Sequence, residues 1–232
     1  MNERIQTNMH SFKVSRFILI LSFSSLVSSA LFGVLTIILL NDGPLSIIKN
    51  SVAGMKICMV AALVHCLLTF LISFLYGSES SEKYPFKPKI TSVVKSLFIL
   101  ILGCIIFYII CICYGAPLLS STTETFHFSM LLTVLICLPN CIFCGSNLDN
   151  WFTMFTSSSA NGVETVVYFT SLCSLLGAWL GAVPIPLDWD RPWQEWPISC
   201  VIGALSGYCL GLLMAAVKLP WNLRNANKSK YF

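Results

Sequence analysis

Three carboxylates and one arginine gather between Val183 and Pro197, where the sequence comes closest to a chemical site. Asp188 and Asp190 flank Trp189, which is the spacing of the Asp-x-Asp metal motif of transferases that use sugar nucleotides. Metal-dependent transfer is therefore one interpretation. A three-residue match is weakly specific, however, and no nucleotide-binding domain accompanies it. A plain interfacial belt, or a surface that docks a partner protein or a lipid headgroup, is favoured instead.

The same stretch should form a short and rigid loop. Four prolines restrict its backbone and stop a helix from continuing, while three tryptophans place amphipathic rings at the depth of lipid headgroups. Arg191 can pair with one of the three surrounding acids. We expect a loop with a polar and an apolar side, whose candidate interface residues are Pro184, Pro186, Asp188, Trp189, Asp190, Arg191, Pro192, Trp193 and Trp196.

Elsewhere the side chains that catalysis requires are sparse. The three histidines, His10, His65 and His127, are scattered along the chain. His65 falls inside an apolar segment, where an ionisable group is expensive, but an imidazole bonded to a neighbouring helix is the favoured interpretation. The sequence shows no Gly-rich phosphate loop, paired-histidine zinc motif or Ser/His/Asp set. We therefore expect a protein that is not an enzyme, with no catalytic and no cofactor-binding residue.

The eleven cysteines give no clear chemical site either. Their number is odd, their spacing shows no disulfide framework, and most lie inside apolar segments. Cys137, Cys141 and Cys144 share one helical face, which could in principle hold a metal ion. A complete site usually needs a fourth ligand, so small thiols packed among helices are favoured and no metal site is predicted.

Long apolar segments must position these residues. Charged residues make up 10% of the chain and hydrophobic residues 56%, with a mean hydropathy of +0.80. A typical soluble domain is about 25% charged. Uncharged runs long enough to cross the hydrocarbon core should be helices, because backbone polar groups must be satisfied inside the bilayer. We predict an all-α integral membrane protein with a single polytopic domain, a bundle of six transmembrane helices over about residues 17–40, 54–76, 96–115, 125–144, 165–184 and 197–217.

Basic residues indicate the orientation of this bundle. Eleven Lys and Arg residues flank one side of a six-span arrangement, in the N-terminal segment, the loop between spans two and three, and the C-terminal tail. Lys49 and Arg191 fall on the other side. The positive-inside rule therefore places both termini in the cytosol. The net charge of +4 is thus a topology signal, with anionic lipid headgroups rather than nucleic acid as its partners.

The C-terminal tail carries two further signals. Lys228 and Lys230 fit the K-x-K-x-x retrieval pattern of membrane proteins of the endoplasmic reticulum, although a chance basic tail is an equal alternative. Asn227-Lys228-Ser229 is a glycosylation sequon that should stay unmodified on the cytosolic side. A multi-pass protein of the endoplasmic reticulum membrane is the expectation.

Glycines repeat on the last two predicted spans. Gly177 and Gly181 are four residues apart, and Gly203, Gly207 and Gly211 form a row at the same spacing. Such rows let helix backbones approach closely, since lipid offers no hydrophobic drive for helix association. They fit packing between spans five and six, or docking against a span of a partner, and the spacing does not choose. Our hypothesis includes the five glycines, together with the loop residues, in the interface with a partner or lipid.

The run GAWLGAVPIPLDWDRPWQ from Gly177 to Gln194, followed by WPISC from Trp196 to Cys200, closely resembles the signature of the PIG-F family (phosphatidylinositol-glycan biosynthesis class F). The run YGAPL after the third span, the length and the span count are also similar, so the resemblance covers the whole chain. It implies a role in assembling the glycosylphosphatidylinositol (GPI) anchor in the endoplasmic reticulum. Members of this family stabilise large ethanolamine phosphate transferases, which add phosphoethanolamine to GPI mannoses on the lumenal side.

The resemblance also implies a division of labour. The zinc-dependent transferase domain would belong to the partner, and this chain would be a non-catalytic accessory subunit of a hetero-oligomer, in contact with membrane lipids and GPI intermediates. Two alternatives stay open. One is a lipid carrier or scramblase that presents phosphatidylethanolamine or GPI intermediates, and the other is a membrane transferase that uses Asp188 and Asp190.

Overall fold

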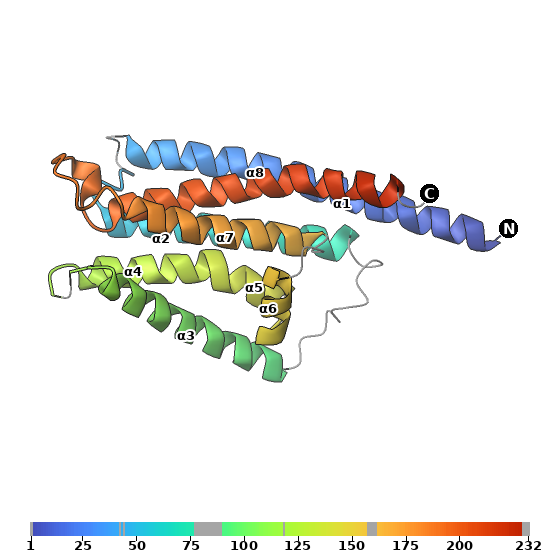
Figure 1. The fold of residues 1–232 in the computed structure, drawn as a ribbon, viewed down its shortest axis with the longest axis horizontal. Helices are drawn as coiled ribbons and strands as arrows, with labels where there is room; N and C mark the ends of the chain where they lie inside the picture. Colours follow the sequence, from blue (N-terminus) through green and yellow to red (C-terminus); the bar gives the residue numbers. More distant parts are fainter. Residues whose placement is uncertain are drawn as a thin grey trace.

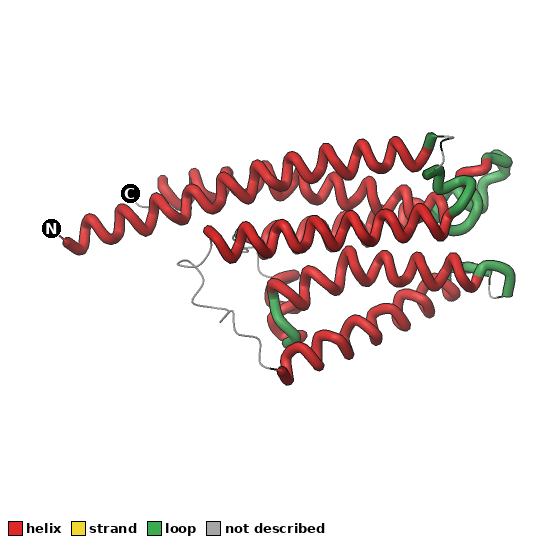
Figure 2. The backbone as a smooth tube through the Cα atoms, turned by 180° about the vertical axis from the view of Figure 1, so that it is seen from behind, coloured by secondary structure: helices red, strands yellow, loops and turns green. Residues whose placement is uncertain are grey.

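The computed structural model describes residues 2–41, 43, 45–76, 90–117, 119–156 and 162–228. Within these ranges the chain forms helices and turns without a strand (Figures 1 and 2). Six helical segments there are long and apolar enough to cross a membrane, which confirms the predicted all-helical bundle with six spans. The spans are α1 (Asn2–Leu40), α2 (Ser51–Tyr76), α3 (Ile90–Cys113), α4 (Thr122–Leu132) with the π-helical turn η1 (Thr133–Cys137) and α5 (Leu138–Phe143), α7 (Val163–Gly181) and α8 (Ile198–Lys228).

The spans run side by side along one long axis (Figure 1). α1 and α7 pack against α8, and α2 contacts α1 and α4. α3, with only 17% of its apolar window buried, lies beside α4 at the edge of the bundle (Figure 1). The start of α1, the end of α8 and the short helix α6 (Leu148–Thr156) lie toward one end, which we call the terminal end. Residues 182–197, which include the short helix η2 (Pro192–Gln194), lie at the opposite end, which we call the loop end.

Glycines bring α7 and α8 into direct backbone contact. A Cβ atom added to Gly177 would collide with the carbonyl oxygen of Gly203, and one added to Gly203 would collide with that of Gly177. This helix pair makes the most extensive contact in the described part of the chain. The other glycines of the two rows also face backbone of the opposite helix: Ser199 for Gly181, Cys173 for Gly207 and Phe169 for Gly211.

α1 packs against α8 through hydroxyl groups. Ser22 Oγ donates to the carbonyl oxygen of Ala216 at 2.7 Å, and Ser29 Oγ donates to that of Cys209 at 3.0 Å. Pro220 lies inside α8 and has no N–H group, so the Ala216 carbonyl lacks its usual helical donor. Ser22 supplies a donor from α1, and α8 continues through the proline.

Pro139 lies where the fourth span is locally irregular. It cannot donate to the carbonyl four residues earlier, and the helix widens into the π turn η1 just before it. Asn140, which is buried, donates from Nδ2 to the Ile136 carbonyl oxygen at 2.7 Å and to Ser171 Oγ of α7 at 3.1 Å. Asn140 therefore connects α5 to α7 directly after the π turn.

His65 of α2 is buried against α8. Its Nδ1 lies 2.7 Å from Tyr208 Oη, and Phe32 of α1 packs edge-on against both rings. The interpretation of His65 as an imidazole bonded to a neighbouring helix is confirmed. This contact joins three spans in the interior of the bundle.

We predict that Gly207→Ala destabilises the bundle, because the added methyl group meets backbone of α7 that cannot rotate away. Overpacking of this kind costs roughly 1–3 kcal/mol. The thermal unfolding temperature of the purified chain in mild detergent should therefore fall. Gly33→Ala is the matched control on α1, since a Cβ there meets nothing within 4 Å. Equal unfolding temperatures for the two variants would contradict the assigned α7–α8 contact.

Candidate functional site

Residues 182–197 connect α7 to α8 at the loop end and contain the predicted loop residues (Figure 1). α7 ends at Gly181, before the predicted limit at residue 184, and the chain continues through consecutive turns. In one of them the N–H of Leu187 donates to the carbonyl oxygen of Pro184 at 3.1 Å. Pro184 and Pro186 have no N–H group, so neither can continue the helical ladder and turns replace it.

Gln194 holds this connection together from the inside. Its Nε2 donates to the carbonyl oxygens of Pro184 and Leu187, both at 2.7 Å, and its Oε1 accepts from the N–H of Arg191 at 2.9 Å. The side chain is 9% exposed. One side-chain amide thus satisfies three backbone groups, which belong to Pro184, Leu187 and Arg191. Gln194 was not among the predicted site residues; a long amide between prolines is the one signal that could have indicated it.

Two of the three loop tryptophans attach the loop to the bundle. Trp196 Nε1 donates to Thr125 Oγ1 of α4 at 2.9 Å, and its ring lies edge-on to Phe128 with 5.7 Å between centroids. Trp193 is partly buried against the main core. Trp189, in contrast, is 55% exposed. The tryptophans therefore differ in role, and only one of them is presented to the surroundings.

The outer surface of the loop mixes apolar and charged groups. The Trp189 and Trp193 rings are 6.0 Å apart, so the exposed ring rests near an attached one. Asp190 has φ of 48°, a left-handed conformation that Asp adopts more readily than most residues. We call the exposed residues of this connection the loop face: Val183, Pro186, Leu187, Asp188, Trp189, Asp190, Arg191, Pro192 and Glu195.

The charges of the loop face are not neutralised within the described part of the chain. Arg191 forms no ion pair there with Asp188, Asp190 or Glu195, although its position in the sequence would allow one. Exposed pairs of this kind gain little in water, which explains why the fold does not require one. One cation and three anions are therefore open to a partner.

The predicted glycines lie outside the loop face. All five are covered by the facing helix within the chain: Gly177, Gly181, Gly203, Gly207 and Gly211. This is the packing between spans five and six. Gly181, against Ser199, brings the two ends of the loop close together.

Thiols and carboxylates form no group of three or more that could hold a metal ion, as far as the described residues extend. All eleven cysteines are free. Cys144 Sγ donates to Met154 Sδ at 3.4 Å, and Cys137 packs beside Gly103 of α3. These two cysteines, which the sequence placed on one helical face with Cys141, therefore pack against neighbouring helices.

Some sequence signals fall beyond the structural description. Lys228 is the last residue of α8. Parts of four sequence signals lie outside the described residues. They are Lys230 of the retrieval pattern, Ser229 of the sequon, Lys83, Lys87 and Lys89 of the basic loop, and Leu118 of the YGAPL run.

The fold and the loop define a multi-pass helical membrane protein that presents one internally braced loop at the end opposite its termini. Residues 18–216 match the model of the GPI biosynthesis protein family Pig-F, and the chain belongs to this family. The resemblance drawn from its loop sequence is thereby confirmed.

Curated relatives extend this result. The chain is 35% identical over 167 residues to the GPI ethanolamine phosphate transferase, stabilizing subunit, of Homo sapiens, covering 72% of this chain and 76% of the relative. It is 35% identical over 178 residues to the Mus musculus protein of the same name, covering 76% and 80%. Glycosylphosphatidylinositol anchor biosynthesis protein 11 of Yarrowia lipolytica is 38% identical over 123 residues, 53% of each chain. No solved structure matched the chain.

We predict that Gln194→Ala loosens the loop without unfolding the bundle. The carbonyls of Pro184 and Leu187 and the N–H of Arg191 lose their partners, and each unsatisfied group costs about 1–3 kcal/mol. The Arg191 amide should then exchange its hydrogen faster with solvent, as measured by hydrogen–deuterium exchange mass spectrometry.

Glu195→Ala is the control for this experiment, since it removes the exposed neighbour of Gln194. Its exchange pattern should match the wild type. Unchanged protection of residues 184–194 in Gln194→Ala would mean that the amide does not brace the loop.

Proposed function

We propose that this chain is a non-catalytic stabilising subunit of a GPI ethanolamine phosphate transferase complex in GPI-anchor biosynthesis. Membership of the Pig-F family carries the proposal, together with two relatives whose names describe such a subunit. The large partner adds phosphoethanolamine to a GPI mannose with catalytic residues of its own. This chain keeps that partner assembled in the membrane.

The loop face is the proposed docking surface. Gln194, Trp193 and Trp196 hold it in one shape, so docking freezes few additional torsions and the entropy cost of association stays low. Trp and Arg are residue types enriched among those that dominate binding energy at protein interfaces. Trp189 and Arg191 are both exposed on the loop face.

The charges of the loop face favour a protein over lipid tails as the occupant. Arg191 and the three surrounding acids would be costly in hydrocarbon but suit a polar interface rim. Unpaired charges of both signs also allow selective pairing with a complementary surface. The loop face therefore meets the part of the transferase that lies outside the bilayer.

The proposed orientation places the terminal end in the cytosol and the loop end in the lumen of the endoplasmic reticulum. It rests on the excess of Lys and Arg beside the terminal end, and the lysine pattern at the C-terminus supports that compartment. The proposed membrane neighbours are lipids and GPI intermediates. The loop face would then lie on the side where the partner modifies GPI.

We predict that Trp189→Ala combined with Arg191→Ala lowers the amount of transferase that co-purifies with the tagged chain by at least about tenfold, because the loss of even one dominant interface residue costs about 2 kcal/mol, or roughly thirtyfold in affinity. Quantitative mass spectrometry of the mild-detergent eluate measures this ratio. Phe152→Ala on α6 is the matched control, because this 71% exposed aromatic lies at the terminal end.

Both variants should elute in size-exclusion chromatography like the wild type, which separates lost docking from lost folding. Wild-type recovery of the transferase by the double variant would exclude the loop face as the docking surface. Ethanolamine phosphate transfer by a preparation that contains this chain alone would overturn the non-catalytic role, and lipid movement by the isolated chain in vesicles would favour a carrier.

We predict that an Asn-x-Thr sequon inserted after Pro192 is glycosylated in microsomes, whereas the same sequon placed before α1 is not. The reason is that these positions lie at opposite ends of the bundle (Figure 1). In the proposed orientation, the two ends face opposite sides of the membrane. The gel shift removed by endoglycosidase measures the modification. Glycosylation at the N-terminal position with none in the loop would reverse the proposed orientation.

A further inference from the structure

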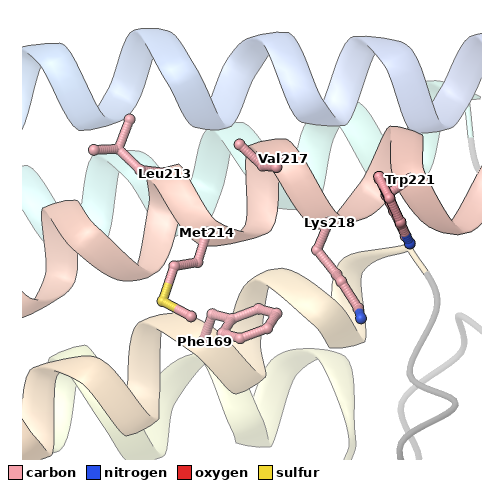
Figure 3. Close-up of a pocket in the computed structure, with 6 residues that line it drawn as sticks. All are labelled: Phe169, Leu213, Met214, Val217, Lys218 and Trp221. Carbon is pink, nitrogen blue, oxygen red and sulfur yellow. The ribbon is translucent and has the colours of Figure 1, made fainter.

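A groove lies between the first half of α7 and the second half of α8 (Figure 3). These parts of the two helices are the ones away from the loop face, toward the terminal end (Figure 1). Its volume is about 540 Å³. The glycine row of α8 ends at Gly211, and beyond it side chains rather than backbone line the space beside α7 (Figure 3). The lining residues are Phe169 of α7 and Leu213, Met214, Val217, Lys218 and Trp221 of α8.

The groove combines an apolar floor with one cation. Met214 and Phe169 face each other across the two helices, whereas Lys218 extends from α8 toward α7 (Figure 3). Lys218 is exposed and forms no ion pair with any described residue, Glu164 in the first turn of α7 included. Its ammonium group is therefore available to an anion from outside the chain.

The order of residues along α8 matches the depth profile of a membrane. Leu213, Met214 and Val217 belong to the apolar part of the span, and Lys218 and Trp221 follow toward the terminal end. Lys and Trp are the residues that settle at the boundary between hydrocarbon and headgroups. We therefore expect the floor of the groove at acyl-chain depth and the ammonium at phosphate depth.

The side chains favour a lipid over a helix of a partner. Helices that pack in membranes meet through small residues that let backbones approach, as α7 and α8 themselves do. Leu213, Val217 and Trp221 are bulky and leave a groove rather than a flat small-residue face. An acyl chain can follow such a groove, and an anionic headgroup complements its single cation.

We propose that this groove binds one anionic phospholipid of the leaflet at the terminal end. Its phosphate lies at Lys218, one acyl chain follows Phe169 and Met214, and Trp221 borders the headgroup. The site is separate from the loop face and does not depend on the proposed docking of a transferase.

The test uses the full chain, with the proteins that co-purify with it, in phosphatidylcholine nanodiscs. A minor fraction of the lipid is phosphatidylserine with a photoreactive group on its acyl chain, and labelled peptides are mapped by mass spectrometry. Label is expected on the peptides of Phe169 and Met214. Lys218→Gln should lower it about fivefold, the effect of one Lys contact with an anionic lipid, and Lys218→Arg should restore it.

Two controls make the result specific. Lys95→Gln removes an exposed lysine near the start of α3, also toward the terminal end, and should leave the label unchanged. Met214→Trp fills the groove and should lower the label although Lys218 is intact. Equal labelling of Lys218→Gln and wild type, equal labelling by a phosphatidylcholine probe, or a groove that stays unlabelled because a partner protein covers it would each overturn the proposal.

Discussion

Direct backbone contact between α7 and α8 is the constraint on which the candidate site depends. Lipid tails are as apolar as the helix surfaces, so burial alone cannot hold two spans together and close packing has to do so. Gly181 lies against the backbone of Ser199, where α7 ends and α8 begins. Both ends of the connecting segment are therefore fixed close together, and residues 182–197 must fold back on themselves.

A segment that folds back at a membrane surface has to satisfy its own backbone. Prolines remove some backbone donors from this segment. The buried side chain of Gln194 supplies two donors and one acceptor to the backbone around it. Trp196 then fixes the segment to α4 through Thr125. Because the interior is satisfied in this way, the charged residues and Trp189 can all point outward without loss of stability. The exposed loop face thus results from internal hydrogen bonding rather than from a separate domain.

The six spans could be predicted because hydrocarbon excludes charge and forces each apolar run into a helix. The glycine spacing predicted a close contact, but a spacing identifies a helix face and not what covers it, and here the cover is the neighbouring span. The position of Gln194 between prolines was its one sequence signal, but its partners were not evident because they come near only after the loop has closed. Pro220 likewise gave no sign that Ser22 of α1 would supply the missing donor, because that pairing joins opposite ends of the chain.

The described part of the chain is held together by contacts of its own. Hydrogen bonds between side chains and neighbouring helices connect α1 with α8, α2 with α8, and α5 with α7, all inside this chain. Together with the glycine contact, they hold both ends of the α7–α8 hairpin in a fixed relation. The loop face is therefore a preformed surface, and docking of a partner there, as proposed above, would not have to complete the fold of this chain.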